Sequence, residues 1–168
     1  RGGQRSHSFA TVLSQIGWQT TLLTGGYKTY RQYVRQALSH LGTTLSLRVL
    51  CGYTGSAKTK LLQALQAAQF QVLDLEALAA HRGSLLGQMW QETPQQQPAQ
   101  KWFESQLVAQ LQAFDPRRPI WVESESKTIG KIHVPKPLWE NMRRSPVVEV
   151  VLPMAERVKL LIAEYPHL

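Results

Sequence analysis

The sequence predicts an α/β fold in which helices flank a parallel β-sheet. Short apolar runs bounded by turn residues alternate with amphipathic segments along most of the chain, as in parallel strands joined by helices. A glycine-rich turn at residues 52–59 also joins an apolar run to an amphipathic helix, which is the layout of a phosphate-binding loop, or P-loop. The chain has 168 residues, 43% of them hydrophobic, and is therefore long enough to bury one sizeable core.

The first part of the chain predicts two helices and a strand. Residues 6–16 and 27–38 carry apolar side chains at helical spacing, and residues 18–23 form a short apolar run that we expect to be a strand. Residues 41–43 are the expected linker to the alternating part. That part predicts strands at 45–51, 70–74, 119–124 and 147–152, and helices at 58–68, 76–81, 98–113, 137–143 and 154–165.

The charge balance favours polyanions as partners. Nineteen Lys and Arg residues against eleven Asp and Glu give a formal net charge of +8. Nucleic acid is the leading candidate, and a solvated basic surface that only maintains solubility is the alternative. The chain contains no apolar run of membrane-spanning length and no secretory leader, so we expect a cytoplasmic protein with no membrane partner. The single cysteine, Cys51, excludes an internal disulfide framework and a multi-cysteine zinc site.

The turn Gly52-Tyr-Thr-Gly-Ser-Ala-Lys-Thr59 contains the residue types that hold a phosphate group. Its two glycines allow a tight bend whose N–H groups point inward, beside the positive end of the following helix. Lys58 would contact terminal phosphate oxygens, and the hydroxyl of Thr59 suits a Mg²⁺ ion. Ala57 stands where the full motif has glycine, and its Cβ disfavours a positive φ. A strand-to-helix turn that holds no ligand is the alternative. The predicted phosphate-binding residues are Gly52, Thr54, Gly55, Ser56, Ala57, Lys58, Thr59 and Arg82.

Charged residues also follow the predicted strands, where parallel sheets collect their ligands. The candidate acids are Asp74, Glu76, Glu123 and Glu125, which could hold Mg²⁺ through water or orient a nucleophile. A surface carboxylate or a helix cap is the alternative for each. Mg²⁺, at Thr59 and Glu123, is the one cofactor that these residues suggest. Arg82 precedes a flexible Gly-Ser pair and could turn toward a phosphate, or it could simply complement a helix dipole.

Several stretches together resemble one family, the tRNA 2-selenouridine synthases, which pair a rhodanese-like domain with a P-loop domain. The most specific are the block from Asp74 to Ser84 and the block from Glu123 to Gly130, which general ATPases lack. The others are Arg1-Gly-Gly-Gln-Arg-Ser6, Gly25-Gly-Tyr-Lys-Thr-Tyr-Arg31, Gly52-Tyr-Thr-Gly-Ser-Ala-Lys-Thr59 and Gln97-Pro-Ala-Gln-Lys-Trp-Phe-Glu104.

The resemblance implies that residues 1–41 are the C-terminal remnant of a rhodanese-like α/β domain and that residues 42–168 are a P-loop domain truncated at its C-terminal side. It further implies a transferase that replaces the sulfur of 2-thiouridine in tRNA with selenium from selenophosphate. An S-geranyl intermediate made from geranyl diphosphate would precede that exchange. On this view the loop at 52–59 holds a leaving diphosphate.

The sequence departs from the family at one position that matters for chemistry. The family's catalytic cysteine would lie two positions before Arg1, so we expect this chain to bind ligands without completing selenium transfer. The remaining rhodanese loop, Arg1, Gly2, Gly3 and Arg5, would bind an anion. Candidate contacts to the tRNA backbone are Lys101, Arg117, Arg118, Lys127 and Lys131. A P-loop ATPase or small-molecule kinase and a noncatalytic RNA-binding fragment remain the alternative functions.

Overall fold

A four-stranded parallel sheet forms the centre of the molecule. The computed structural model describes residues 3–81, 96–124 and 126–164. Neighbouring strands of the sheet follow the order β2-β3-β1-β6, and each pair is parallel. The strands are β1 (Leu47–Cys51), β2 (Gln71–Leu73), β3 (Ile120–Glu123) and β6 (Val147–Glu149). The α/β class and the parallel sheet that the sequence predicts are therefore confirmed.

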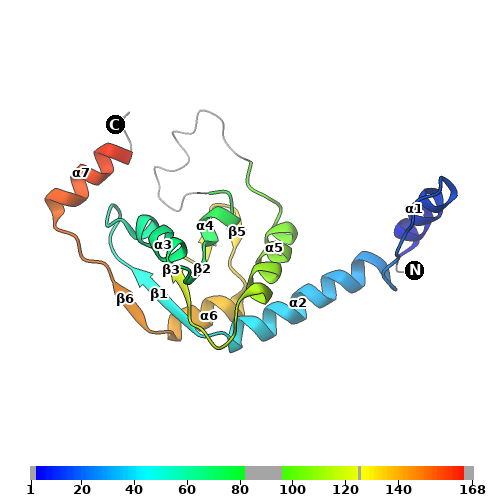
Figure 1. Cartoon of the computed structure of the whole chain (residues 1–168), viewed down its shortest axis with the longest axis horizontal. Helices are drawn as coiled ribbons and strands as arrows, with labels where there is room; N and C mark the ends of the chain where they lie inside the picture. The colour runs from blue at the N-terminus through cyan, green and yellow to red at the C-terminus, as the bar shows by residue number, and fades with distance from the viewer. Residues whose placement is uncertain (1–2, 82–95, 125, 165–168) are drawn as a thin grey trace.

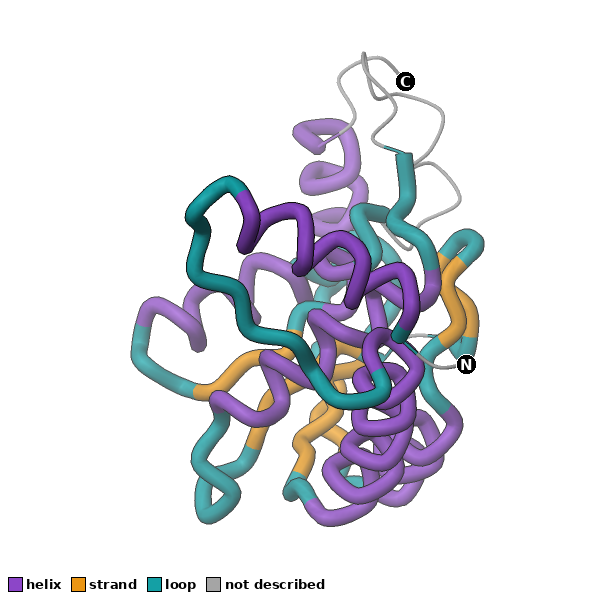
Figure 2. The backbone as a smooth tube through the Cα atoms, turned by 90° about the vertical axis from the view of Figure 1, so that its right-hand side faces the viewer, coloured by secondary structure: helices purple, strands orange, loops and turns teal. Residues whose placement is uncertain are grey.

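Helices cover both faces of this sheet (Figures 1 and 2). Helices α2, α5 and α6 lie on one face, and α3 lies on the other. The helices are α1 (Gln4–Gln15), α2 (Gly26–Thr44), α3 (Lys58–Ala67), α4 (Leu75–Leu78), α5 (Gln100–Ala113), α6 (Lys136–Arg144) and α7 (Met154–Glu164).

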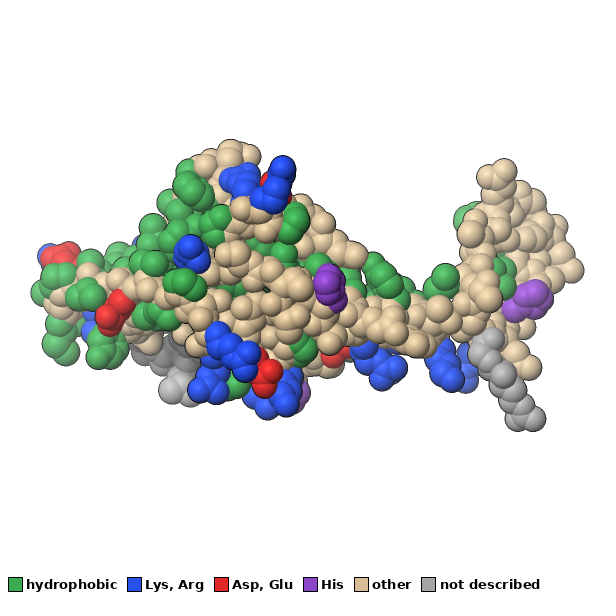
Figure 3. Space-filling model, turned by 90° about the horizontal axis from the view of Figure 1, so that it is seen from below, with side chains coloured by type: hydrophobic (Ala, Val, Ile, Leu, Met, Phe, Trp, Pro, Cys, Tyr) green, Lys and Arg blue, Asp and Glu red, His purple; other side chains and the backbone are tan. Residues whose placement is uncertain are grey.

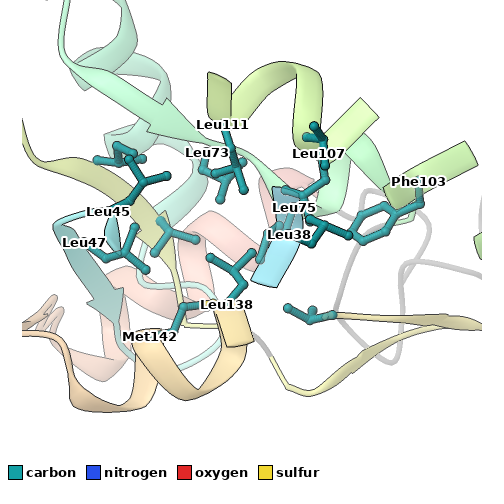
Figure 4. Close-up of a cluster of buried hydrophobic side chains, with 14 of the residues drawn as sticks. Leu38, Leu45, Leu47, Leu73, Leu75, Phe103, Leu107, Leu111, Leu138 and Met142 are labelled. Atoms are coloured by element: carbon teal, nitrogen blue, oxygen red, sulfur yellow. The ribbon is translucent and has the colours of Figure 1, made fainter. Parts of the chain in front are cut away.

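The alternation of side chains along the strands creates two cores. In β1, Leu47 and Val49 face the α2, α5 and α6 layer, whereas Leu50 faces α3. The larger core also takes in Phe103 of α5 and Leu138 of α6, both fully buried (Figure 4). Strands buried on both faces in this way hold the carboxyl ends of β1 and β3 in a fixed position beside each other.

Helix α2 differs from the prediction because it continues through the expected linker at 41–43. Gly42 lies in this part of the helix and is buried. A Cβ at this position would come within 2.8 Å of the backbone nitrogen of Leu138. The glycine that suggested a linker therefore serves the close packing of α2 against α6.

The strand expected at residues 18–23 is not formed, and this prediction was wrong. The segment connects α1 to α2 without regular structure, and the two sheets of the described residues do not include it. Its large side chains are mostly exposed, with Trp18 at 66% and Leu23 at 52%. An apolar run becomes a strand only where another strand supplies hydrogen-bond partners, and the run has none here.

A small hairpin, β4 (Thr128–Ile129) and β5 (Ile132–His133), was missed by the sequence reasoning. Ile129 and Ile132 are buried, so the hairpin closes one side of the larger core. The side chain of Gln97 holds its turn, donating from Nε2 to the carbonyl of Ile129 (3.0 Å) and accepting from the amide of Lys131 (2.7 Å).

The long helix α2 extends beyond the sheet and carries α1 at its far end (Figure 1). A hollow of about 540 Å³ lies between α1 and the start of α2, lined by residues that include Phe9, Leu13 and Tyr27. It is at the opposite end of the molecule from α7 and the loop after β1. Within the described parts of the chain, no helix has both the length and the apolar character needed to cross a membrane.

Candidate phosphate-binding site

The loop between β1 and α3 adopts the tight bend that its glycines predict. Gly52 has a φ of 151° and Gly55 a φ of 77°, and the amide of Ser56 donates to the carbonyl of Tyr53 (3.1 Å). A Cβ on Gly52 would lie 2.6 Å from the carbonyl oxygen of Val150 and 2.7 Å from Oγ of Ser56. The bend therefore requires glycine at position 52 for space and at position 55 for conformation.

Ala57 adopts the conformation that its side chain disfavours. It precedes α3 as the N-cap residue with a φ of 63° and a ψ of 25°, and its carbonyl accepts the amide of Leu61 (3.0 Å). No side chain caps the helix here. The first turn of α3 therefore has no cap of the kind that a Ser, Thr or Asp side chain supplies at many helices, and an anion can take that role.

Ser56 adds a second polar group without a partner. Its side chain is buried at 2% exposure, and its Oγ has no hydrogen-bond partner. Gly52 is its close neighbour, because a Cβ built there would lie 2.7 Å from this oxygen. A buried hydroxyl without a partner is uncommon in folded proteins, since it loses its hydrogen bonds to water. A ligand oxygen in the loop would satisfy it.

Lys58 folds back over the loop. Its Nζ donates to the carbonyl oxygens of Gly52 (2.9 Å) and Tyr53 (3.3 Å) and lies 3.5 Å from Oε1 of Glu123. The side chain is only 13% exposed. The ammonium group therefore lies at the loop itself and not in bulk solvent, which is the position that a phosphate-binding lysine needs.

Glu123 is the acidic partner of this lysine and ends β3, opposite Leu50 of β1. Burial raises the pKa of its carboxyl above the ordinary value of 4.5, and the negative charges of Glu76 and Asp74 act in the same direction. The charge of Lys58 and its hydrogen bond to Glu123 lower that pKa, but each of these two effects is smaller than that of burial. The carboxyl therefore gives up its proton less readily than an exposed glutamate does.

The other candidate acids lie in different surroundings. Asp74 caps α4, accepting the amide of Ala77 on Oδ1 (2.8 Å), which is the helix-cap role that the sequence left open. Glu76 is in the first turn of that short helix. Glu125 and the predicted phosphate ligand Arg82 lie outside the described residues. Among the residues that are described, no group of three or more His, Cys, Asp or Glu is arranged to hold a metal ion.

Arg157 and Tyr53 are parts of the loop's surroundings that the sequence reasoning missed. Arg157 comes from α7, and its Nε donates to the carbonyl of Thr54 (3.1 Å). The guanidinium lies over the ring of Tyr53, with 4.9 Å between Cζ and the ring centroid. No local pattern could reveal this contact, because the two partners are 103 residues apart in the chain.

The candidate RNA contacts fall at two edges of the sheet. Lys127 and Lys131 follow β3 and are exposed around the hairpin. Lys101 is also exposed and lies near them, because the neighbouring Gln100 is bonded to the hairpin. Its Nε2 donates to the carbonyl of His133 (2.8 Å), and its Oε1 accepts from the amide of the same residue (2.9 Å). These three lysines lie at the carboxyl edge, where the loop also lies.

The two arginines lie at the amino edge, before β3. Arg117 is paired with Asp115, with 3.1 Å between Nε and Oδ1, and these hydrogen bonds hold the pKa of that carboxyl below its ordinary value. Arg118 donates from Nη2 to the carbonyl of Gln69 (2.8 Å).

The two described residues of the predicted rhodanese loop, Gly3 and Arg5, belong to the α1 end of the molecule, far from this site (Figure 1). Gly3 is the N-cap of α1, and its backbone lies against Gly26, where a Cβ would come 2.8 Å from the Cα of Gly3. Arg5 is exposed on α1, whereas Arg1 and Gly2 are outside the described residues. The part of this loop that is described therefore does not meet the loop after β1.

Comparison with known proteins gives a consistent result. The sequence model of the tRNA 2-selenouridine synthase AAA domain matches residues 45–167. Proteins called tRNA 2-selenouridine synthase are 37% identical in Nitrosomonas eutropha, 36% in Alcanivorax borkumensis and 39% in Salmonella typhi. Each alignment covers 98% of this chain but only 42–44% of the relative, so the chain spans less than half the length of these proteins. No solved structure matches the chain.

Proposed function

Because this chain belongs to the tRNA 2-selenouridine synthase family, we propose that it is the phosphate-binding part of an enzyme that modifies tRNA. The modification is the replacement of sulfur by selenium at 2-thiouridine, with selenophosphate as the donor and an S-geranyl intermediate made from geranyl diphosphate. Residues 42–168 form the phosphate-binding domain, and residues 1–41 are the end of a rhodanese-like domain. The rhodanese cysteine would supply the selenium-carrying thiolate in a longer chain.

The observation that supports this proposal best is the position of Lys58. Its ammonium lies at the loop, where it contacts two carbonyl oxygens and one carboxylate of the described residues. All of these contacts are to oxygen atoms. The oxygen atoms of a diphosphate carry more negative charge and would attract the ammonium more strongly. A diphosphate would replace them and also meet the first amides of α3 and the buried hydroxyl of Ser56.

The loop's role in geranyl transfer is to hold the leaving group. The sulfur of 2-thiouridine attacks C1 of the geranyl chain, the bond between C1 and the diphosphate oxygen breaks, and the diphosphate departs with the electron pair. N3 of the base gives up its proton to solvent, so the S-geranyl product is neutral. Charge develops on the diphosphate in this step, so Lys58 and the loop amides stabilise it more in the transition state than before. The same parts bind a nucleotide in P-loop ATPases, which remain the second candidate on the loop geometry alone.

The residues around the loop also suit a Mg²⁺ ion carried by the diphosphate. Thr59 lies in the first turn of α3 with its side chain exposed, and Glu123 lies beside Lys58. The hydroxyl of Thr59 would be a direct ligand, with Glu123 acting through water. The ion would neutralise part of the charge on the leaving diphosphate.

The test compares Lys58→Ala with Lys136→Ala, which removes the same charge from α6, where the lysine is 77% exposed and paired with Glu140. Titration calorimetry would use inorganic pyrophosphate and geranyl diphosphate, with and without Mg²⁺. We expect Lys58→Ala to weaken both about 10- to 100-fold, because a hydrogen bond to a charged group contributes about 1.5–3 kcal/mol. Lys136→Ala should bind as the unaltered chain does.

A second measurement addresses the reaction. The chain would be incubated with 2-thiouridine-containing tRNA and geranyl diphosphate, and the nucleosides would be analysed by mass. We expect S-geranylated nucleoside from the unaltered chain and from Lys136→Ala, and little from Lys58→Ala. Turnover of ATP without any binding of geranyl diphosphate would instead establish the ATPase alternative.

A further inference from the structure

Helix α7 touches the phosphate-binding loop with one face only. Arg157 and Leu161 lie four residues apart on that face, and both contact the loop. A Cβ on Gly55 would come 2.8 Å from Cγ of Leu161 and 3.1 Å from the carbonyl oxygen of Arg157. The backbone of the loop at Gly55 therefore packs directly against α7. Outside this face the helix is open, with Met154 at 77% and Ile162 at 66% exposure.

The guanidinium of Arg157 fixes the direction of one peptide unit. Its Nε donates to the carbonyl oxygen of Thr54 (3.1 Å). In a trans peptide the C=O of residue 54 and the N–H of Gly55 point in opposite directions, and the structure contains no cis peptide among its described residues. Because the carbonyl is tied to α7, the N–H of Gly55 points away from α7.

Tyr53 holds the guanidinium in place from another side. The ring lies under Cζ of Arg157, with 4.9 Å between Cζ and the ring centroid. Tyr53 as a whole is 71% exposed, so the tyrosine does not contribute to the core. A cation over an aromatic face is attracted by the ring quadrupole, and stacking of this kind suits the flat guanidinium better than an ammonium. Two adjacent loop residues, Tyr53 and Thr54, are thus held by one side chain.

We propose that α7 braces the phosphate-binding loop and that Arg157 is a positioning residue for anion binding. By holding the carbonyl of Thr54 toward the helix, it keeps the peptide between residues 54 and 55 from rotating its oxygen toward the anion. This inference rests on the proposed function of the loop as a diphosphate site. The loop glycine at 55 then has a second reason to be glycine, because α7 leaves no room for a Cβ.

The experiment compares Arg157→Ala and Arg157→Lys with Lys159→Ala in the whole chain. Lys159 is on the same helix, its side chain is 71% exposed, and it pairs with Glu156, so its removal changes the charge equally without touching the loop. Two quantities are measured: the affinity for inorganic pyrophosphate by calorimetry, and the backbone ¹⁵N order parameters of residues 53–57. Thermal unfolding of each variant confirms that it is folded.

We expect Arg157→Ala to weaken pyrophosphate binding about tenfold, because the loop amides are no longer held in the binding arrangement. The order parameters of the loop should fall from values typical of rigid backbone, about 0.85, toward about 0.6. Arg157→Lys should recover only part of the affinity, since it restores the charge but not the flat, directional contact. Lys159→Ala should leave both quantities unchanged.

Unchanged order parameters and affinity in Arg157→Ala would overturn the brace. Full recovery in Arg157→Lys would also overturn it, because charge alone would then explain the loss. If the unaltered chain does not bind pyrophosphate, the proposed diphosphate site fails. The order parameters would still decide whether α7 holds the loop, so the two failures can be told apart.

Discussion

At the scale of single residues, the pair formed by Lys58 and Glu123 is the most informative part of the site. Both side chains are largely buried, at 13% and 14% exposure, yet the lysine is satisfied by two carbonyls as well as by the carboxylate. Breaking a buried pair usually leaves an uncompensated charge. Here the two carbonyl oxygens would still accept hydrogen bonds from Lys58. The carboxylate of Glu123 can therefore be replaced without leaving the ammonium group unpaired.

The pKa of Glu123 makes a prediction about stability and pH. Burial raises that pKa above 4.5, so the folded chain binds a proton at Glu123 more tightly than the unfolded chain does. The contribution of Glu123 to stability is therefore present at low pH and is lost as the pH rises from about 4.5 through the folded pKa. Urea unfolding of the chain and of Glu123→Gln at several pH values would measure it.

We expect the stability of Glu123→Gln relative to the unaltered chain to increase with pH across that window and to level off above it. The amide cannot ionise, so it is free of the cost of charging in a buried site. A relative stability that instead decreases with pH would show that Lys58 dominates the environment of the carboxyl. Asp115→Asn, at a partly exposed carboxyl whose pKa is lowered by its hydrogen bonds with Arg117, should give the opposite sign.

Ala57 makes a second prediction at this scale, because it holds a left-handed conformation at φ 63°. Such a conformation costs a residue with a Cβ about 1–2 kcal/mol, and glycine avoids most of this cost while losing about 0.5–1 kcal/mol of backbone entropy. Ala57→Gly should therefore stabilise the fold by about 0.5–1 kcal/mol in urea unfolding. The matched change Ala64→Gly, inside α3, should destabilise it by about 1 kcal/mol.

At the scale of elements, the sequence predicts what is local and misses what depends on packing. Apart from the hairpin of β4 and β5, the strands and helices from residue 45 onward follow from short-range periodicity, and the structure confirms their order with small shifts at the ends. The segment at 18–23 has the same apolar character as a strand but no partner strand, so its pattern misleads. Gly42 reads as a break in a helix, and only the closeness of α6 explains it.

The candidate site divides in the same way. The loop residues are contiguous, so their bend and the place of Lys58 could be predicted from eight consecutive letters. Glu123 could also be predicted, because the carboxyl ends of neighbouring parallel strands meet at one edge. Asp74 instead caps a helix, which was the alternative reading of this residue. That role arises because the short helix α4 begins directly after β2. Arg157 reaches the loop only through the return of the chain along β6, which no local pattern shows.

At the scale of the whole molecule, the basic residues divide into groups at different edges of the sheet, a division that the net charge does not reveal. Lys and Arg side chains stand in several groups along the face seen from below, with few carboxylates among them (Figure 3). The carboxyl edge carries Lys101, Lys127 and Lys131 on the side of the phosphate-binding loop, and the amino edge carries Arg117 before β3 and Arg144 before β6. On the proposed function, a tRNA whose base must reach the loop would lie across the carboxyl edge.

This arrangement predicts that the carboxyl-edge lysines contribute more to tRNA binding than equal charges elsewhere. Lys127→Ala with Lys131→Ala should weaken binding and reduce the slope of log affinity against log salt by about one for each lost phosphate contact. Arg117→Ala with Arg144→Ala removes the same charge from two exposed residues at the amino edge and should change the slope little. Filter-binding or fluorescence titrations between 50 and 200 mM salt, roughly the range where such slopes are measured, would compare the two double variants. Equal losses in both would mean that net charge, and not the edge of the sheet, governs tRNA binding, because non-specific attraction depends only on the summed field of the molecule.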